Sequence, residues 1–275
     1  MNKKIGLILA LVLVSLMMVG TVSAGLFDFL GGSNANQTAN DESTFIVGFD
    51  AEFPPYGYKD DSGNYVGFDL DLAKEVCERN NWTFKAQPID WDAKDAELDS
   101  GSIDCIWNGF TIDGRENDYL WSNPYFDNKQ VFIVKSGSGI EKIADLKGKT
   151  VETQKDSSAL EALNGDNKTI KDTFATLTEV ADYNTAFMDL ESGACDAVAM
   201  DIGVAEYDID NKNNSDDFTI LDEYITTEKY GIGFKKGNDA LKDQVQATLD
   251  EMFKDGTVLK IAEKYGISED ALIQP

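Results

Sequence analysis

Polar residues follow two buried strands in this sequence, and both strands are entered in the same way. Segments 98–105 (LDSGSIDC) and 190–197 (LESGACDA) each read as a last helical turn, a glycine suited to a left-handed C-cap and an acidic step into a strand. The strands run out into Asn108, Gly109 and Thr111 in the first case and into Asp201 in the second. Ligands bind at the carboxyl ends of strands in open α/β sheets. The repeat therefore predicts two α/β lobes that share a cleft for one small polar molecule, unless it is only a common helix–glycine–strand joint.

The absence of histidine excludes several kinds of catalytic site. With no histidine in 275 residues, the chain has no Ser–His or Cys–His pair, no imidazole base and none of the commonest metal ligand. Cys77, Cys105 and Cys195 show no CxxC spacing, so we expect buried free thiols rather than a disulfide framework or a metal site. The sequence also lacks a phosphate-binding loop motif. We therefore expect a protein that is not an enzyme and uses neither a cofactor nor a metal.

The composition is strongly acidic. The chain has 50 Asp and Glu against 24 Lys and Arg, a formal net charge of −26 at pH 7. Nucleic-acid binding needs clustered basic side chains, so this class of partner is excluded, and an anionic membrane surface is disfavoured. A solvated acidic surface, which keeps an exported protein soluble, explains the excess of acidic over basic residues. We expect a monomer.

The first 24 residues have the pattern of a signal peptide. Lys3 and Lys4 precede an apolar run over 5–19, and residues 22–24 (VSA) fit a signal peptidase site. Cleavage there would start the mature chain at Gly25. The alternative is an uncleaved anchor, because the run is little shorter than the ~20 residues that span a bilayer. No cysteine lies near the junction, so we expect an extracytoplasmic protein, in the periplasm or at the outer face of the cytoplasmic membrane, that is not a lipoprotein.

The rest of the chain divides into a tether and two lobes. Residues 25–43 are rich in Gly, Ser, Asn and Asp without an apolar period, which indicates a flexible tether. The strand and helix patterns predict a first lobe over 44–134, a second lobe over 135–231, and a return to the first lobe with C-terminal helices over 232–275. We expect the chain to cross between lobes at 135–139 and again near 230–233. Two crossings permit hinge closure around a ligand.

Several motifs along the chain match one known family. They are 48–50 with 53–56, 67–76 (GFDLDLAKEV), 103–111 (IDCIWNGFT), 121–125, 144–149 and 255–257. On these motifs the sequence from 44 to 273 resembles the family 3 extracellular solute-binding proteins, the amino-acid receptors of ABC importers. The resemblance implies a periplasmic-binding-protein-like type II fold, in which two α/β lobes are joined by two hinge strands and clamp an amino acid between them. It also implies an ABC permease and ATPase complex as the partner.

The resemblance implies which residues meet the two charges of a free amino acid. Arg115 is similar to the arginine that binds the α-carboxylate through two parallel hydrogen bonds. It lies alongside Thr111 and the Gly109 backbone, with Asn108 on the same strand end. The alternative for Arg115 is a surface arginine paired with Asp113 or Glu116.

Asp201 is similar to the family's aspartate for the α-ammonium group, a reasonable partner for a buried carboxylate. The alternative for Asp201 is a cap on the following helix. Ser158 matches a contact at a helix start, where hydroxyl and free N–H groups bind anions, or it is a plain cap.

The remaining matches concern the ligand's side chain. Phe53 and Trp91 match positions that hold it between apolar or aromatic faces, although Trp91 could instead fill the lobe core. Asp50 matches a position near the side-chain end, with Glu52 close by. Two carboxylates beside an aromatic pair suit a cationic or amide side chain. Lys94 stands where the family is usually apolar, and could point into the cleft and neutralise one acid.

Two other functions compete with amino-acid capture. An exported cyclohexadienyl-dehydratase-like enzyme would need a proton donor, for which Glu52 or Asp50 with a raised pKa is conceivable. A ligand-sensing module would need a separate receptor, because no membrane helix follows the predicted fold. The paired Arg115 and Asp201 favour capture of a polar amino acid for an ABC importer.

Overall fold

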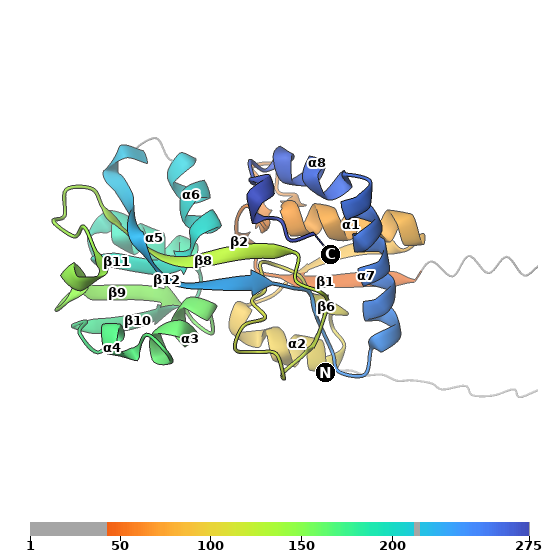
Figure 1. Ribbon diagram of the computed structural model, residues 1–275, viewed down its shortest axis with the longest axis horizontal. Coiled ribbons are helices and arrows are strands. Elements are labelled where there is room, and N and C mark those ends of the chain that lie inside the picture. Colours follow the sequence, from red (N-terminus) through yellow and green to blue (C-terminus); the bar gives the residue numbers. More distant parts are fainter. Residues whose placement is uncertain (1–42, 212–214, 275) are drawn as a thin grey trace, which may run out of the picture. The chain divides into compact units, whose positions relative to one another are not determined.

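The computed structural model describes residues 43–211 and 215–274. The predicted signal peptide over 1–24 and, apart from Ser43, the predicted tether over 25–43 lie outside the described residues. The described part belongs to one compact unit, Asp41–Pro275. It is built around two five-stranded sheets, which we use to define two lobes (Figure 1).

The first lobe contains the sheet with strand order β5-β1-β6-β13-β7. Its strands are β1 (Thr44–Phe49), β5 (Thr83–Pro88), β6 (Cys105–Ile106), β7 (Leu120–Trp121) and β13 (Gly233–Phe234). Strand β1 runs parallel to both β5 and β6, because helices carry the chain back between them, whereas β13 is antiparallel to β6 and β7. A small antiparallel sheet, β2-β3-β4, precedes the first helix and consists of Glu52–Phe53, Gly57–Lys59 and Tyr65–Val66.

Helices cover the first sheet and bury the apolar side chains that its strands present. They are α1 (Phe68–Asn80), α2 (Lys94–Ser100) after a 3₁₀ turn at Trp91–Ala93, α7 (Asp239–Lys254) and α8 (Thr257–Lys264), with a last 3₁₀ turn at Glu269–Ala271. Phe45, Val47 and Phe49 of β1 are buried in a core that α1 and α7 also enter. The predicted buried free thiols are confirmed: Cys77, Cys105 and Cys195 are all buried and unpaired.

The second lobe contains the sheet with strand order β10-β9-β11-β8-β12. Its strands are β8 (Phe126–Lys135), β9 (Thr150–Gln154), β10 (Thr176–Val180), β11 (Ala197–Asp201) and β12 (Phe218–Tyr230). Its helices are α3 (Ser158–Asn164), α4 (Lys168–Lys171), α5 (Tyr183–Ser192) and α6 (Ile202–Asp210), with 3₁₀ turns at Ile143–Leu146 and Ser215–Asp217. The two helix–glycine–strand joints form as predicted, with Gly101 at φ 78° and Gly193 at φ 83° in the left-handed region.

Strands β8 and β12 connect the lobes. They pair antiparallel out to Phe126 and Tyr230, and Figure 1 shows them running side by side from the second sheet toward the first. The C-terminal segment meets the same point, because Leu272 bridges Phe126 and the Ile273 N–H donates to the Tyr125 carbonyl at 2.9 Å. The chain returns to the first sheet between Tyr230 and Gly233.

The first crossing lies earlier than the sequence indicated. Strand β8 pairs with β12 between Phe126 and Lys135 and with β11 between Gln130 and Val134. The chain therefore leaves the first sheet between Trp121 and Phe126, and not at 135–139. The range 44–134 expected for the first lobe therefore includes a strand of the second sheet. The apolar run over 131–134 marks only the apolar half of β8, because the other half carries polar side chains, of which Asn128 and Gln130 are buried. With this correction, the α/β fold of two lobes joined by two strands is confirmed.

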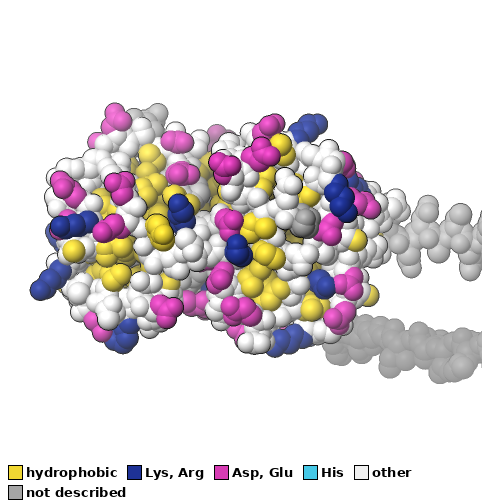
Figure 2. All heavy atoms as spheres, in the orientation of Figure 1, with side chains coloured by type: hydrophobic (Ala, Val, Ile, Leu, Met, Phe, Trp, Pro, Cys, Tyr) yellow, Lys and Arg dark blue, Asp and Glu magenta, His cyan; other side chains and the backbone are white. Residues whose placement is uncertain are grey.

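Carboxylates outnumber basic groups among the charged side chains at the surface. Figure 2 shows Asp and Glu side chains spread over the visible face of both lobes, with fewer Lys and Arg among them, as the net charge of −26 requires. Within the described ranges, no helix combines the length and apolar character needed to cross a bilayer.

Candidate ligand-binding site

One pocket brings together the nine residues that were predicted to contact the ligand. It lies between the two sheets, and its free cavity volume is about 10 Å³, so the side chains that line it are packed closely together. Its lining consists of Asp50, Phe53, Trp91, Asn108, Gly109, Thr111, Arg115, Gln154, Ser157, Ser158, Tyr183 and Asp201. Nine of these are the predicted candidates. Gln154, Ser157 and Tyr183 were not predicted, although Ser157 stands beside Ser158 in the sequence.

The first lobe forms its part of the pocket at the end of β6. Gly109 has φ 53°, and a Cβ there would lie 2.7 Å from the Phe53 ring, so a glycine is required. Its N–H donates to Asp69 Oδ2 at 2.6 Å, and the Tyr125 hydroxyl donates to Asp69 Oδ1 at 2.7 Å. Burial raises the pKa of Asp69 to about 7. Asp69 therefore supports this loop from beneath.

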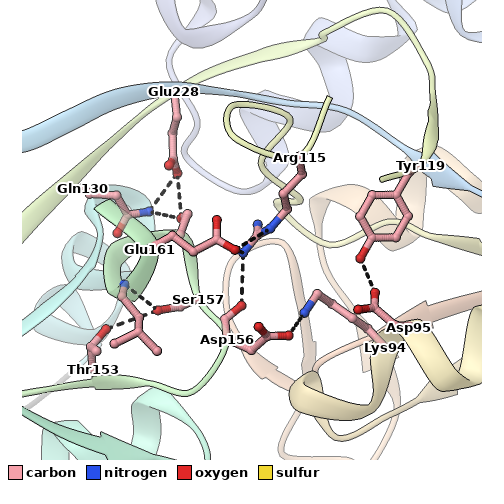
Figure 3. A network of polar contacts seen from close by, with 12 residues as sticks. Lys94, Asp95, Arg115, Tyr119, Gln130, Thr153, Asp156, Ser157, Glu161 and Glu228 are labelled. Carbon is pink, nitrogen blue, oxygen red and sulfur yellow. Dashed lines mark hydrogen bonds and ion pairs between the residues drawn. The ribbon is translucent and has the colours of Figure 1, made fainter. Parts of the chain in front are cut away.

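Arg115 reaches from the first lobe to the second. Its guanidinium packs 5.4 Å from the centre of the Phe110 ring and is 5% exposed. Its Nε donates to Glu161 Oε1 at 3.2 Å and its Nη2 to the Asp156 carbonyl at 3.1 Å (Figure 3). The alternative of a surface arginine paired with Asp113 or Glu116 is therefore wrong. Arg115 is a buried cation with part of its hydrogen-bonding fork bound to the opposite lobe.

Lys94 makes a second contact between the lobes. It is 2% exposed, lies 5.3 Å from the centre of the Trp91 ring and pairs with the Asp156 carboxylate. Asp156 has φ 56°, a left-handed conformation that is costly for a residue with a Cβ. Figure 3 shows Asp156 between Lys94 and Arg115, holding one through its side chain and the other through its backbone. The expectation that Lys94 neutralises an acid is met by Asp156, not by Asp50 or Glu52.

Asp201 lies at the second lobe's strand end, in a network of polar side chains. Its Oδ1 accepts hydrogen bonds from Asn128 at 2.7 Å, Gln130 at 2.8 Å and the Tyr230 hydroxyl at 2.5 Å. It precedes α6, but its side chain makes no capping hydrogen bond, so the capping alternative is wrong. Burial, and then the charge of Glu228, raises the pKa of Asp201 to about 8.

The start of α3 supplies two hydroxyls. Ser157 is the N-cap, because its Oγ accepts from the Leu160 N–H at 3.2 Å. Ser158 is not the cap: its Oγ accepts from Gln130 at 2.9 Å and donates to Glu228 Oε1 at 3.3 Å. Ser158 is therefore part of the Asp201 network, which the sequence did not indicate.

Aromatic rings and one more acid complete the lining. Trp91 packs edge-on against Phe110 in the first lobe's core and also lines the pocket. Its contact with a ligand side chain stays a prediction. Phe53 lies between Tyr56 and Tyr183. Asp50 is buried, accepts from Gln154 Nε2 of the second lobe at 2.6 Å and from the Glu52 N–H at 2.9 Å, and burial raises its pKa to about 6.

The chemistry available in this pocket is recognition of opposite charges. It has a guanidinium on one lobe, carboxylates on both lobes and aromatic faces between them. Across residues 43–211 and 215–274, no three acidic or cysteine side chains gather in a way that could hold a metal ion.

Comparison with known proteins identifies the family. The profile of the bacterial extracellular solute-binding proteins, family 3, matches residues 45–268. The L-cystine-binding protein TcyJ of Escherichia coli (strain K12) is 30% identical over 228 residues, covering 82% of this chain and 83% of that protein. A probable histidine-binding protein of Neisseria gonorrhoeae is 32% identical over 248 residues, covering 87% and 89%.

A solved structure agrees with the fold as a whole. The crystal structure of an ABC uptake transporter substrate binding protein from Streptococcus pneumoniae with bound histidine aligns at a TM-score of 0.81 and 32% identity. The alignment covers 86% of this chain and 96% of that one. The resemblance noted in the sequence is thereby confirmed, and the chain belongs to the bacterial extracellular solute-binding proteins of family 3.

Proposed function

We propose that this protein captures a free polar amino acid outside the cytoplasm and delivers it to an ABC permease and its ATPase. The observation that carries the proposal is that Arg115 and Asp201 line one pocket. Both side chains are buried, and each comes from a different lobe. An amino acid carries the two complementary charges. Relatives named for cystine and histidine support the same class of ligand.

Each charge of the ligand has a partner of suitable chemistry. A guanidinium has five N–H donors in a planar fork, so Arg115 can bind an α-carboxylate while Thr111 and the Gly109 region line its other side. Asp201 and Ser158 face the α-ammonium group from the second lobe. Phe53 and Trp91 enclose the ligand's side chain, with Asp50 at its end and Asn108 holding the Asp50 backbone through a 3.0 Å hydrogen bond.

Closure of the lobes retains the ligand. Four polar contacts already join the lobes beside the pocket: Lys94 to the Asp156 carboxylate, Arg115 to Glu161 and to the Asp156 carbonyl, and Gln154 to Asp50. A ligand that binds both Arg115 and Asp201 adds contacts that exist only when the lobes are together. It therefore shifts the population toward the closed form, by as much as its affinity for that form exceeds its affinity for the open one.

We further propose that residues 1–24 direct export and are removed, and that 25–43 tether a monomeric receptor that is not a lipoprotein. The family consists of extracellular proteins, which supports this location. Mass spectrometry of the protein secreted or released by the native host gives the N-terminus directly. A mature chain that starts at Gly25 is the expected result, and a retained leader would overturn this part of the proposal.

Thermal unfolding tests the binding function. The mature protein, refolded to remove any copurified ligand, is heated with each of the twenty amino acids and with a ring-bearing organic acid such as prephenate. A ligand at a hundred times its dissociation constant stabilises the fold by about 2.7 kcal/mol. A shift with one amino acid or one chemical class supports the proposal. A response to the ring-bearing acid alone would instead favour the dehydratase-like enzyme.

Two pocket variants and two matched controls make the test specific. Arg115→Ala and Asp201→Ala are expected to abolish the shift, because each removes the partner of one ligand charge. Arg79→Ala and Asp127→Ala remove an arginine and an aspartate that lie at the surface in ion pairs. These controls should keep the shift. Equal responses in all four variants would contradict the proposed site.

A further inference from the structure

Two buried carboxylates share the same hydrogen-bond donors behind the pocket. Asn128 Nδ2 lies 2.7 Å from Asp201 Oδ1 and 2.7 Å from Glu228 Oε1. Gln130 Nε2 lies 2.8 Å and 2.7 Å from the same two oxygens. The two carboxyl groups are therefore close neighbours, held by a pair of amides on β8. Figure 3 shows the Gln130–Glu228 side of this arrangement.

The surroundings of this pair offer no charge to balance it. Asp201 is 3% and Glu228 5% exposed, and within the described residues neither carboxyl group has an ion pair with Lys or Arg. The buried amide oxygens of Asn128 and Gln130 find no partner among the described residues, because both amides point their N–H groups at the carboxyls.

The groups that face the pair from the neighbouring elements are neutral, acidic or engaged elsewhere. They are Tyr230 on β12, Tyr56 after β2, Tyr183 on α5, Ser158 on α3, and Arg115 and Asp50 across the pocket. Arg115 is bound to Glu161 and Asp156. Two adjacent buried anions without a cation are strongly disfavoured, so one of the two carboxyl groups must hold a proton.

We infer that the Asp201–Glu228 pair holds one proton until a ligand binds, and releases it when the ligand's ammonium group arrives. This inference rests on the proposed function. The O–H bond of the protonated carboxyl breaks, its proton goes to the solvent, and the ammonium group keeps its own protons and donates a hydrogen bond to the ionised Asp201. One proton leaves for each ammonium bound. Glu228 is then a positioning residue, which acts on the ligand through Asp201, Gln130 and Ser158.

The direction of the pKa of Asp201 agrees with this geometry. Burial and the neighbouring Glu228 raise it well above its usual value, which favours a proton on the pair. Below the pKa of the pair the ligand competes with that proton, and its affinity is expected to fall about tenfold for each pH unit. Replacing Glu228 with glutamine keeps the size of the side chain and a carbonyl acceptor, but removes the charge that disfavours ionised Asp201.

Isothermal titration calorimetry measures the number of protons that are released when the ligand binds. The mature protein is titrated at pH 7 in phosphate and in Tris, whose ionisation enthalpies differ, so that the difference in binding heat gives the protons released. L-arginine and L-glutamine are the first probes, because neither side chain titrates between pH 5.5 and 8.5, followed by any amino acid that gives a thermal shift. The wild type is expected to release close to one proton. Glu228→Gln is expected to release far fewer and to move the loss of affinity to lower pH.

Controls separate this inference from the proposed function. Glu179→Gln removes a charge at an exposed position of β10 in the same lobe and should leave the proton count unchanged. Binding with the same heat in both buffers, or equal proton release by the wild type and Glu228→Gln, would overturn the proton release but leave amino-acid capture intact. No binding heat and no thermal shift with any amino acid would overturn both. The wild-type measurement decides the matter even where Glu228→Gln folds poorly.

Discussion

Asp69 supports the pocket without lining it. It is fully buried on α1, and its two oxygens accept from the Gly109 N–H and the Tyr125 hydroxyl. Gly109 lines the pocket, and Tyr125 directly precedes the hinge strand β8. One carboxylate therefore ties the ligand loop to the hinge.

Asp69→Asn is expected to weaken both stability and ligand binding. An amide has one acceptor oxygen, so one of the two donors loses its partner, at a cost of about 1–3 kcal/mol. The free energy of unfolding in urea and the ligand dissociation constant measure the two effects. Glu78→Gln, an exposed change on the same helix, is the control. Unchanged binding in Asp69→Asn would mean that Gly109 is held in place without this carboxylate.

At the level of single residues, the sequence identified the groups at strand ends and missed those behind them. Arg115 and Asp201 could be predicted because a motif or a repeat marks their positions. Glu228, Asn128 and Gln130 lie on long strands where nothing local distinguishes a buried polar side chain from an exposed one. Their roles depend on the pairing of β8 with β12, which is about 100 residues distant in the chain.

Among the secondary-structure elements, the turn between β9 and α3 joins the two lobes beside the pocket. Asp156 in this turn binds Lys94 through its carboxylate and Arg115 through its carbonyl, both in the other lobe. Its φ of 56° would suit a glycine better. A glycine at this position would lack the carboxylate that binds Lys94.

Asp156→Gly is expected to lower ligand affinity without lowering the stability of the fold to the same extent. The glycine relieves about 1 kcal/mol of backbone strain but removes the contact that favours the closed form. Calorimetric titration and urea unfolding give the two quantities. Asp156→Asn removes the charge while keeping a residue that tolerates the left-handed conformation, and should also bind more weakly.

Lys94→Met completes a double-mutant cycle for this contact. If Lys94 and Asp156 act together, the double variant should bind about as weakly as the more affected single variant. Strictly additive losses would show that the two residues contribute independently, and would contradict a shared role in closure.

The positions of most elements could be predicted, whereas the lobe boundary could not. The glycines after α2 and α5 ended both helices where the sequence indicated, because a left-handed C-cap depends on a single residue. The strand β8 was recognised only over its apolar half. Its first half carries Asn128 and Gln130, whose burial is decided by the carboxylates of a distant strand rather than by their own polarity.

For the molecule as a whole, buried carboxyl groups link stability to pH. Burial raises the pKa of Asp50 to about 6 and of Asp69 to about 7, and burial together with Glu228 raises that of Asp201 to about 8. A carboxyl group whose pKa is higher in the folded than in the unfolded chain binds more protons when folded. Its contribution to the free energy of unfolding is therefore fully present below about pH 4, and this contribution is lost as the pH rises through the pKa of the folded state.

We expect the free energy of unfolding to fall between pH 5 and pH 8. Repulsion among the negative surface charges acts in the same direction. Urea unfolding at pH 5, 6.5 and 8 in constant salt measures the trend. Asp201→Asn should flatten it, whereas Asp172→Asn, at an exposed position paired with Lys168, should not. A stability that rises steadily over this range would contradict the expectation.

Trp91 has a consequence for how this protein can be observed. Its indole forms part of the pocket wall, packs on Phe110 and lies beside the Lys94 ammonium group. Indole emission responds to nearby charge and solvent, so ligand entry is expected to change the intrinsic fluorescence, and Trp91→Phe should remove most of that change. The chain thus carries an optical reporter of its own occupancy, with which capture and release can be followed in real time without a label.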